Sequence, residues 1–286
     1  MIARASCLGA ATIVNAIATG RGAAFGIRLR ADAEANLARG LGELDIDVGP
    51  EEAGPALVAA CVARLSKSLG QPLAGRVATR SEIPVSRGLK SSSAAANAVV
   101  LAATRSLRMG FDDLEVVNLG VDAALDAGVT ITGAFDDACA AYFGGVVLTD
   151  NRQRKILRRD HLPSDLLAVL AIPDGTVAKP SLRGVDFFPI AHDVAEAFDL
   201  ALKGDYGPAL ERNGHAYCRL LGIDPGPGER ARRAGALAAG LTGTGPAFVA
   251  LCRQDDAKAV ARAMASDTVE TRIVPLNGTK ASEVVS

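Results

Sequence analysis

The 286-residue sequence contains no tryptophan, and only 4% of its residues are aromatic. Few side chains are therefore available for stacking against nucleic-acid bases. The formal net charge is −1, so no strong electrostatic attraction to nucleic acids or membrane surfaces is expected. These absences favour a small polar partner over a polymer or a lipid surface.

The five cysteines are widely spaced without a CxxC pair, and the three histidines are equally scattered. This pattern argues against a disulfide framework or a structural zinc site, and it predicts buried free thiols. No segment reaches the roughly 18 consecutive apolar residues that span a bilayer. The N-terminus also lacks the clear basic start, apolar run and cleavage site of a signal peptide. We therefore expect a cytoplasmic protein.

Hydrophobic periodicity alternates between strand and helix without a regular βαβ rhythm. Residues 1–35 predict twisted strands, and further strands are expected at 75–83, 144–149, 166–172 and 270–275. Helices are expected at 55–69, 91–108, 114–127, 136–142, 190–202, 206–221, 228–239 and 255–265, and residues 129–134 predict a short turn or strand. The pattern predicts a two-layer α+β fold with domains at 1–152 and 153–286. Their boundary falls in the charged stretch 151–160, which is itself expected to be a solvated hairpin.

The segment PVSRGLKSSSAAANAVVLAATRSL places a glycine-containing turn directly before an alanine-rich helix. Ser91, Ser92 and Ser93 occupy the first helical turn, whose free N–H groups and macrodipole attract anions. Gly88 allows the backbone to approach a phosphate, and Lys90 adds a positive charge. One serine would suffice for helix capping, and three exceed that need. The phosphate-binding loop is therefore predicted to comprise Pro84, Val85, Ser86, Arg87, Gly88, Leu89, Lys90, Ser91, Ser92, Ser93 and Ala94.

The common nucleotide-binding motifs are absent from this sequence. No glycine precedes Lys90 as a Walker A motif requires, and neither Gly20-Arg-Gly22 nor Gly243-Thr-Gly245 continues into GxGxxG. Protein-kinase signatures such as HRD and DFG are also missing. A P-loop or Rossmann-type nucleotide site is therefore disfavoured.

In TGAFDDACAAYFGG, the adjacent carboxylates Asp136 and Asp137 are flanked by small or apolar residues. Two neighbouring carboxylates in a poorly solvated site raise the pKa of one of them, which suits a general base or a metal ligand. One of the two could instead simply cap the following helix.

The loop Pro84-x-x-x-Gly88-Leu89-x-Ser91-Ser92-Ser93-Ala94 resembles the central motif of the GHMP kinases, which include galactokinase and the homoserine, mevalonate and phosphomevalonate kinases. The segments NAIATGRGAAFGI, TGAFDDACAAYFGG and LTGTGPAFVAL resemble flanking motifs in the same order, so the resemblance covers essentially the whole chain. Lys90 replaces a family glycine and Ser93 an alanine. Both departures resemble the archaeal-type shikimate kinase branch.

This resemblance implies a fold with an N-terminal half similar to a ribosomal-protein domain and a ferredoxin-like C-terminal half. It implies ATP-dependent, Mg²⁺-assisted phosphorylation of shikimate to 3-phosphoshikimate, a step of aromatic amino-acid biosynthesis. A homoserine- or mevalonate-type kinase is the alternative enzyme. A non-catalytic RNA-binding protein is the alternative from another class, and the near-neutral charge and few aromatic residues count against it.

The resemblance also implies roles for single residues. Asp136 corresponds to the catalytic carboxylate, with Asp137 open as an alternative one residue away. Ser92 and Asp126 would hold Mg²⁺, although Asp126 could be a surface carboxylate and Asp122 could serve instead.

Three further residues belong to the first family motif, which lines the acceptor pocket in the kinases that the sequence resembles. Asn15, Thr19 and Arg21 would bind the hydroxyls and carboxylate of the acceptor. The planar guanidinium of Arg21 suits a carboxylate, but it could equally be a charge on a strand surface.

Overall fold

The computed structural model describes residues 1–49, 54–85, 87–174, 182 and 184–285. A long antiparallel hairpin of β1 (Ala3–Val14) and β2 (Arg21–Arg39) forms the spine of its N-terminal part. β2 pairs along its length with β4 (Leu73–Ser81) and with β5 (Val146–Asp150). Shorter partners extend this sheet: β3 (Leu44–Asp47) beside β4, β6 (Lys155–Asp160) beside β5, and β11 (Ser282–Val285) beside β1.

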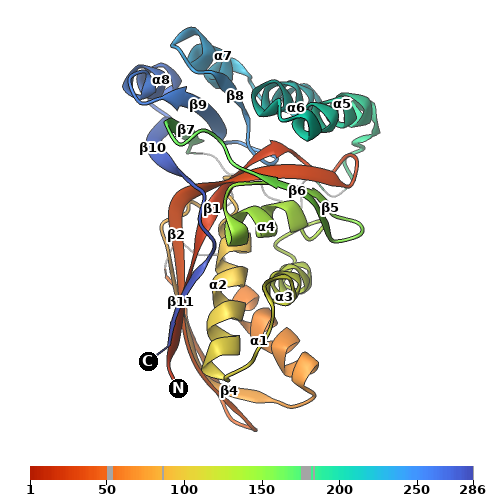
Figure 1. The fold of residues 1–286 in the computed structure, drawn as a ribbon, viewed down its shortest axis with the longest axis vertical. Coiled ribbons are helices and arrows are strands. Elements are labelled where there is room, and N and C mark those ends of the chain that lie inside the picture. The colour runs from red at the N-terminus through yellow and green to blue at the C-terminus, as the bar shows by residue number, and fades with distance from the viewer. Residues whose placement is uncertain (50–53, 86, 175–181, 183, 286) are drawn as a thin grey trace.

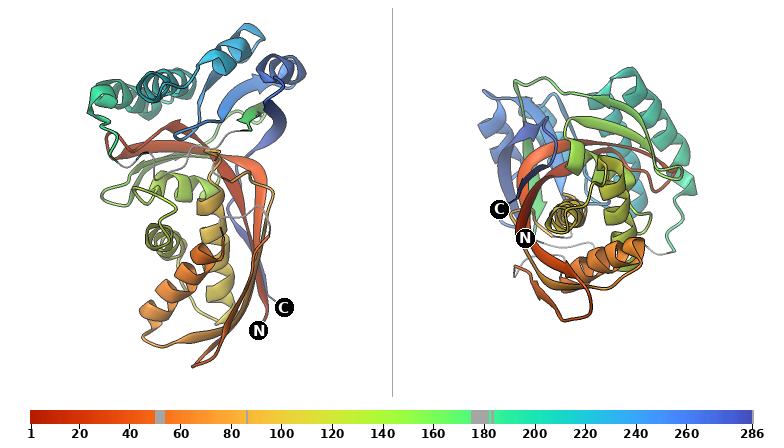
Figure 2. Two further views of the ribbon diagram at one scale, coloured as in Figure 1. Left: turned by 180° about the vertical axis from the view of Figure 1, so that it is seen from behind. Right: turned by 60° about the horizontal axis from the view of Figure 1, so that its bottom comes forward.

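Four helices cover one face of this curved sheet (Figures 1 and 2): α1 (Pro55–Leu69), α2 (Ser91–Ser106), α3 (Asp113–Asp126) and α4 (Phe135–Phe143). Proline at the first helical position and Gly70 in the left-handed conformation bound α1. Helix α2 is buried on almost all sides between the sheet and the other helices. Its many alanines permit this close packing because they leave much of its surface without bulky side chains.

The C-terminal part is built on a second run of antiparallel strands, β10 (Val269–Asn277), β7 (Leu166–Pro173), β9 (Phe248–Arg253) and β8 (Ala238–Leu241). Helices α6 (Tyr206–Leu221), α7 (Gly226–Arg233) and α8 (Ala257–Met264) pack against it, and α5 (Ala191–Lys203) lies beside α6, following the short 3-10 helix η2 (Phe188–Ile190). Strand β10 also pairs with β2, which joins the two parts into one sheet. The hairpin between β1 and β2 extends beneath α5 and α6 (Figure 1).

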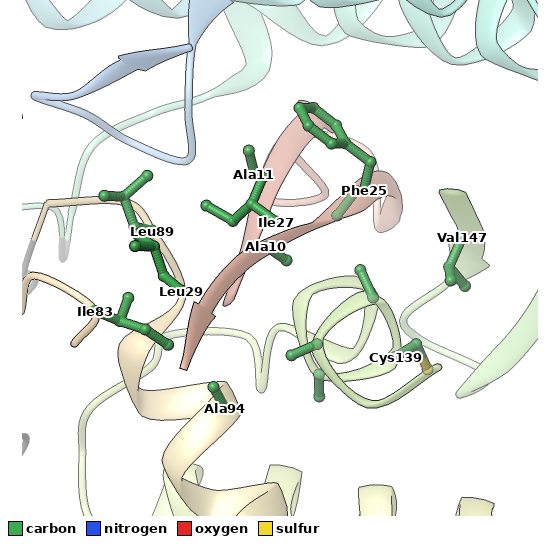
Figure 3. Close-up of a cluster of buried hydrophobic side chains, with 14 of the residues drawn as sticks. Ala10, Ala11, Phe25, Ile27, Leu29, Ile83, Leu89, Ala94, Cys139 and Val147 are labelled. Atoms are coloured by element: carbon green, nitrogen blue, oxygen red, sulfur yellow. The ribbon is translucent and has the colours of Figure 1, made fainter. Parts of the chain in front are cut away.

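Buried side chains from both parts form a continuous core, and it reaches the predicted phosphate loop. Leu89 is 1% exposed and points toward Leu29 and Ile83, while Ala94 packs at the start of α2 (Figure 3). These apolar anchors hold the polar residues between them at the surface of the core. All five cysteines are free and buried, as predicted.

The two-layer α+β fold is confirmed, and so are most of the helices expected from periodicity. The expected helix at 228–239 is wrong beyond residue 233, because α7 ends at Arg233 and residues 238–239 belong to β8. Gly235, with φ of 106°, turns the chain there, and the small residues that follow carry no clear periodicity. Residues 129–134 form bends and irregular backbone and contain no strand. The domain boundary after residue 152 stays a prediction.

The region around the predicted domain boundary folds as a β-hairpin. The charged stretch 151–160 forms the turn and second strand of the β5–β6 hairpin, as expected.

Among the described residues, no helix is both long enough and apolar enough to cross a membrane.

Candidate active site

Two buried threonines, Thr12 and Thr242, join three segments that are remote in sequence, and one of these segments is the phosphate loop. The Thr242 hydroxyl donates to the Gly88 carbonyl at 3.0 Å and accepts from the Thr12 amide at 3.0 Å. The Thr12 hydroxyl in turn accepts from the Gly243 amide at 2.9 Å. The end of β1, the phosphate loop and the C-terminal glycine-rich turn are therefore held in one arrangement.

The loop before α2 contains two residues with left-handed backbone conformations. Gly88 has φ of 83°, and a Cβ there would overlap the Thr242 carbonyl oxygen, so only glycine fits. Lys90 has φ of 66° although it is not glycine, and it directly precedes the first turn of α2. This backbone turn directs Lys90 toward the first turn of α4, where its ammonium pairs with Asp137 at 2.9 Å.

The other loop residues differ in what they offer a phosphate. Arg87 has a buried Nη1 atom without a hydrogen-bond partner among the described residues, and a phosphate oxygen would satisfy it. Pro84 and Val85 are half-buried. Ser86, also predicted to bind ATP, lies outside the described residues.

The three serines lie in the first turn of α2, as predicted. Ser91 and Ser93 are buried and Ser92 is half-buried. Their amides lack intrahelical acceptors because a helix leaves its first N–H groups free. In the part of the chain that the structure describes, the side chain of the N-cap residue Lys90 makes no capping hydrogen bond, so the free donors remain available to an anion.

Asp136 and Asp137 lie in the first turn of α4, and both are buried. Asp137 Oδ2 pairs with Lys90, whereas Asp137 Oδ1 is buried without a hydrogen-bond partner among the described residues. Asp136 Oδ1 accepts from the Asn151 amide at 2.7 Å, and Asp136 Oδ2 lies so close to Gly22 that a Cβ there would overlap it. The two carboxylates are thus held by different partners.

The environment of Asp136 raises its pKa to about 7. Burial is the main cause, because desolvation disfavours the ionised form, and the neighbouring carboxylate of Asp137 adds to it. Lys90 and the Asn151 hydrogen bond act in the opposite direction. A carboxyl group with a pKa near neutrality suits proton abstraction, since such a base also has an appreciable ionised fraction.

A pocket of about 460 Å³ opens beside these carboxylates. Its lining comes from the β1–β2 hairpin, Lys90, the segment before α4, the first turn of α4 and the C-terminal glycine-rich turn. The residues are Thr12, Asn15, Ala16, Ile17, Lys90, Thr130, Ile131, Thr132, Ala134, Asp136, Asp137, Leu182, Gly243 and Thr244.

Of the three expected acceptor-binding residues, Asn15 lines the pocket. Its backbone amide donates to Asn213 Oδ1 at 3.0 Å, and its carbonyl accepts from the Tyr217 hydroxyl at 3.2 Å, so α6 holds this part of the hairpin. Thr19 and Arg21 are not in the lining. The Thr19 hydroxyl bonds to the backbone of Arg21, whose exposed guanidinium lies 5.9 Å from the Phe198 ring centroid.

The two expected carboxylate ligands on α3 are also outside the pocket lining. Asp126 pairs with Arg64 of α1, and this cation lowers the pKa of Asp126. Asp122 pairs with both Arg154 and Arg64. This geometry favours a role for both carboxylates in joining α3 to its neighbours.

Sequence reasoning missed Thr242 as a link to Gly88 and Asn151 as a partner of Asp136. Thr242 lies in a glycine-rich turn and Asn151 in a charged hairpin, and the composition of these segments does not indicate either contact. The only local signal is the position of Asn151 directly after a buried apolar strand, at an end where polar side chains often serve a site.

Comparison with known proteins agrees with this architecture. The family profile described as GHMP kinases N terminal domain matches residues 56–145, and that described as GHMP kinases C terminal matches residues 229–270. The chain belongs to the GHMP kinase family. Membership in a kinase family implies ATP as the phosphate donor.

Curated relatives are similar over most of their length. The protein named shikimate kinase from Pyrococcus abyssi is 44% identical over 267 residues, covering 92% of this chain and 96% of that protein. The shikimate kinase from Methanothrix thermoacetophila is 48% identical over 248 residues, covering 86% of this chain and 84% of that protein.

Solved structures with lower identity share the fold. A homoserine kinase from Cytophaga hutchinsonii superposes with a TM-score of 0.75 at 18% identity, covering 98% of this chain and 97% of that one. The mevalonate kinase of Methanococcus jannaschii gives 0.74 at 15% identity, covering 96% and 98%.

Proposed function

We propose that this protein is a shikimate kinase, which transfers the γ-phosphoryl group of ATP to a hydroxyl of shikimate and releases 3-phosphoshikimate and ADP. One observation supports the reaction type. The N-termini of α2 and α4 meet through the Lys90–Asp137 pair, and they do so at a pocket that Asp136 also lines. The acceptor is proposed because the curated relatives at 44% and 48% identity bear the name shikimate kinase.

In the proposed reaction, the acceptor hydroxyl oxygen forms a bond to the γ-phosphorus while the bond from that phosphorus to the β–γ bridging oxygen breaks. Asp136 orients the hydroxyl and accepts its proton. The free amides and hydroxyls of Ser91–Ser93 bind the phosphates together with the Gly88 backbone. Lys90 neutralises the charge that develops on the transferred group.

Mg²⁺ would accompany ATP and offset the negative charge of its phosphates. The buried Asp137 Oδ1, which has no partner in the described part of the chain, fits a cation better than the arginine-paired Asp126 or Asp122. Oxygen ligands suit this ion. We therefore assign Ser92 and Asp137 as the residues that would hold it.

The acceptor is tested by measuring ADP release from ATP and Mg²⁺ with shikimate, homoserine or mevalonate, and by locating the phosphate on the product with phosphorus–proton correlation NMR. Turnover with shikimate alone and a phosphate on the 3-hydroxyl are expected. Turnover with homoserine or mevalonate but not with shikimate would replace the proposed acceptor.

The role of Asp136 is tested with Asp136→Asn, which keeps the side-chain shape and removes the proton acceptor. We expect kcat to fall by at least about a hundredfold, in line with the loss of general-base catalysis. ATP affinity, measured by calorimetry, should remain within about twofold of wild type because the phosphate loop is untouched. A fully active variant would transfer the role to Asp137.

A further inference from the structure

Asn151 contacts the Asp136 carboxylate from a different element of the fold. It follows β5 directly, and only 9% of its surface is exposed. Its Nδ2 donates to Asp136 Oδ1 at 2.7 Å, and its Oδ1 accepts from the Asp136 backbone amide at 3.2 Å. One side chain therefore binds both the carboxylate of Asp136 and an amide that the first turn of α4 leaves without an intrahelical acceptor.

The orientation of the Asn151 side-chain amide is determined by its neighbours. The fully buried Thr149 hydroxyl donates to Asn151 Oδ1 at 2.7 Å, and its contact with the Gly22 carbonyl is longer, at 3.4 Å. The Asn151 backbone amide donates to the Gly20 carbonyl at 2.8 Å. A 180° flip of the side chain would turn its NH₂ group toward the Asp136 N–H, which can only donate. Asn151 therefore presents its NH₂ group to Asp136.

On the side opposite Asn151, the backbone of Gly22 in β2 restricts the space around the Asp136 carboxylate. A Cβ at Gly22 would overlap Asp136 Oδ2 and would lie 2.7 Å from Asp136 Cγ. Asp136 thus lies between the Asn151 amide and the glycine of β2, and its rotation is restricted from both sides. This arrangement fits a group that must keep one orientation toward a substrate.

Other titratable groups around Asp136 come from three elements. Asp137 and Cys139 share α4 with it, Lys90 approaches from the residue before α2, and Tyr217 lies on α6. Among them only Lys90 is cationic, and its direct ion pair is with Asp137. Asn151 is a side chain that donates a hydrogen bond directly to the Asp136 carboxylate, to which the Asp137 backbone amide also donates.

We propose that Asn151, itself oriented by Thr149, is a positioning residue that holds the Asp136 carboxylate toward the acceptor hydroxyl. The inference rests on the proposed function of Asp136 as the proton acceptor. It adds two residues that act through Asp136 without touching the substrate.

The test compares Asn151→Leu, which removes both hydrogen bonds to Asp136, with Thr149→Val, which removes only the orienting hydroxyl. We expect kcat at pH 7 to fall at least about tenfold in Asn151→Leu with little change in KM, because a carboxylate that is not held in place abstracts the proton less efficiently. Thr149→Val should lower kcat less, and Thr149→Ser, which keeps the hydroxyl, should restore it.

Asn97→Leu is the matched control. Asn97 is also fully buried and donates to α4, at the Ala138 carbonyl at 2.8 Å, without contacting Asp136. Its replacement should reduce stability while leaving kcat close to that of wild type. If Asn151→Leu lowers kcat no more than Asn97→Leu does, Asn151 is only structural and the proposal fails.

A double variant separates this result from the proposed function. In Asp136→Asn, which has no carboxylate to hold in place, adding Asn151→Leu should lower kcat little further, with whichever acceptor the protein phosphorylates. Additive losses would overturn the proposal, whereas a fully active Asp136→Asn would overturn the proposed role of Asp136 instead. Thr149→Val supplies the same decision if the leucine variant does not fold.

Discussion

The buried Lys90–Asp137 pair offers a quantitative test of how the two helix termini are held together. Only 8% of the Lys90 side chain and 13% of the Asp137 side chain are exposed. Lys90→Met would keep much of the packing volume and leave the Asp137 carboxylate buried without its cation. Breaking one partner of a buried pair in this way costs about 3–5 kcal/mol.

The expected change in melting temperature follows from the chain length. An unfolding entropy of about 2.1 cal/mol/K per residue gives roughly 0.6 kcal/mol/K for 286 residues. A loss of about 3–5 kcal/mol therefore corresponds to a decrease of about 5–8 °C, measured by scanning calorimetry at pH 8. Asp137→Asn added to Lys90→Met should recover much of this loss, because no unpaired charge then remains at this position.

Two controls separate the pair from other effects. Arg253→Met breaks the pair with Asp165, whose side chains are 66% and 55% exposed, and should lower the melting temperature by less than about 2 °C. Lys90→Gly removes both the cation and the buried side-chain stem while relieving the left-handed backbone strain at φ of 66°, so its melting temperature should also lie well below that of wild type. Additive losses in the Lys90→Met/Asp137→Asn double variant would refute the reasoning, because independent sites do not compensate.

Three further outcomes are expected. Burial raises the pKa of Asp136 to about 7, above its unfolded value, so the contribution of this residue to stability falls as pH rises from about 4 to about 7. Asp136→Asn has no carboxyl group to ionise, so its melting temperature minus that of wild type should increase from pH 5 to pH 8. A constant difference would contradict the argument that burial raises this pKa. Gly88→Ala should weaken ATP binding at least several-fold in calorimetry, because its Cβ overlaps the Thr242 carbonyl oxygen, and wild-type affinity would exclude a role for this close contact. Asp137→Asn should raise the Mg²⁺ concentration for half-maximal activity and Asp126→Asn should not; the reverse order would favour Asp126 as the ligand.

Local patterns predicted much of the fold because helix signals in this chain are strong. The expected helix at 55–69 coincides with α1, which begins at a proline and ends before a glycine in the left-handed conformation. Strands β3 and β11 were not expected, since they are short and lie at edges of the sheet. Strand β9 was also missed as a separate element, because its apolar residues directly follow the glycine-rich turn.

The candidate site was predicted where its chemistry is local. The three serines at the start of α2 and the two aspartates at the start of α4 were both found, because each group shares one helical turn. Arg64, which binds Asp126, lies 62 positions away, and nothing near Asp126 in sequence indicates it. The resemblance implied a metal ligand at Asp126, whereas the structure pairs this carboxylate with arginine.

By itself, the sequence determined an anion-binding helix terminus, a carboxylate pair at the start of another helix, and a resemblance to one kinase family. These are properties of short segments, because capping, helix dipoles and residue order act within a turn or two. Tertiary structure decided the partners: Thr12 with Thr242 across 230 positions, Lys90 with Asp137, and Asn151 with Asp136. Such contacts form only when the sheet and helices bring separate segments together, and they determine which carboxylate is paired with a cation and which is held by an amide.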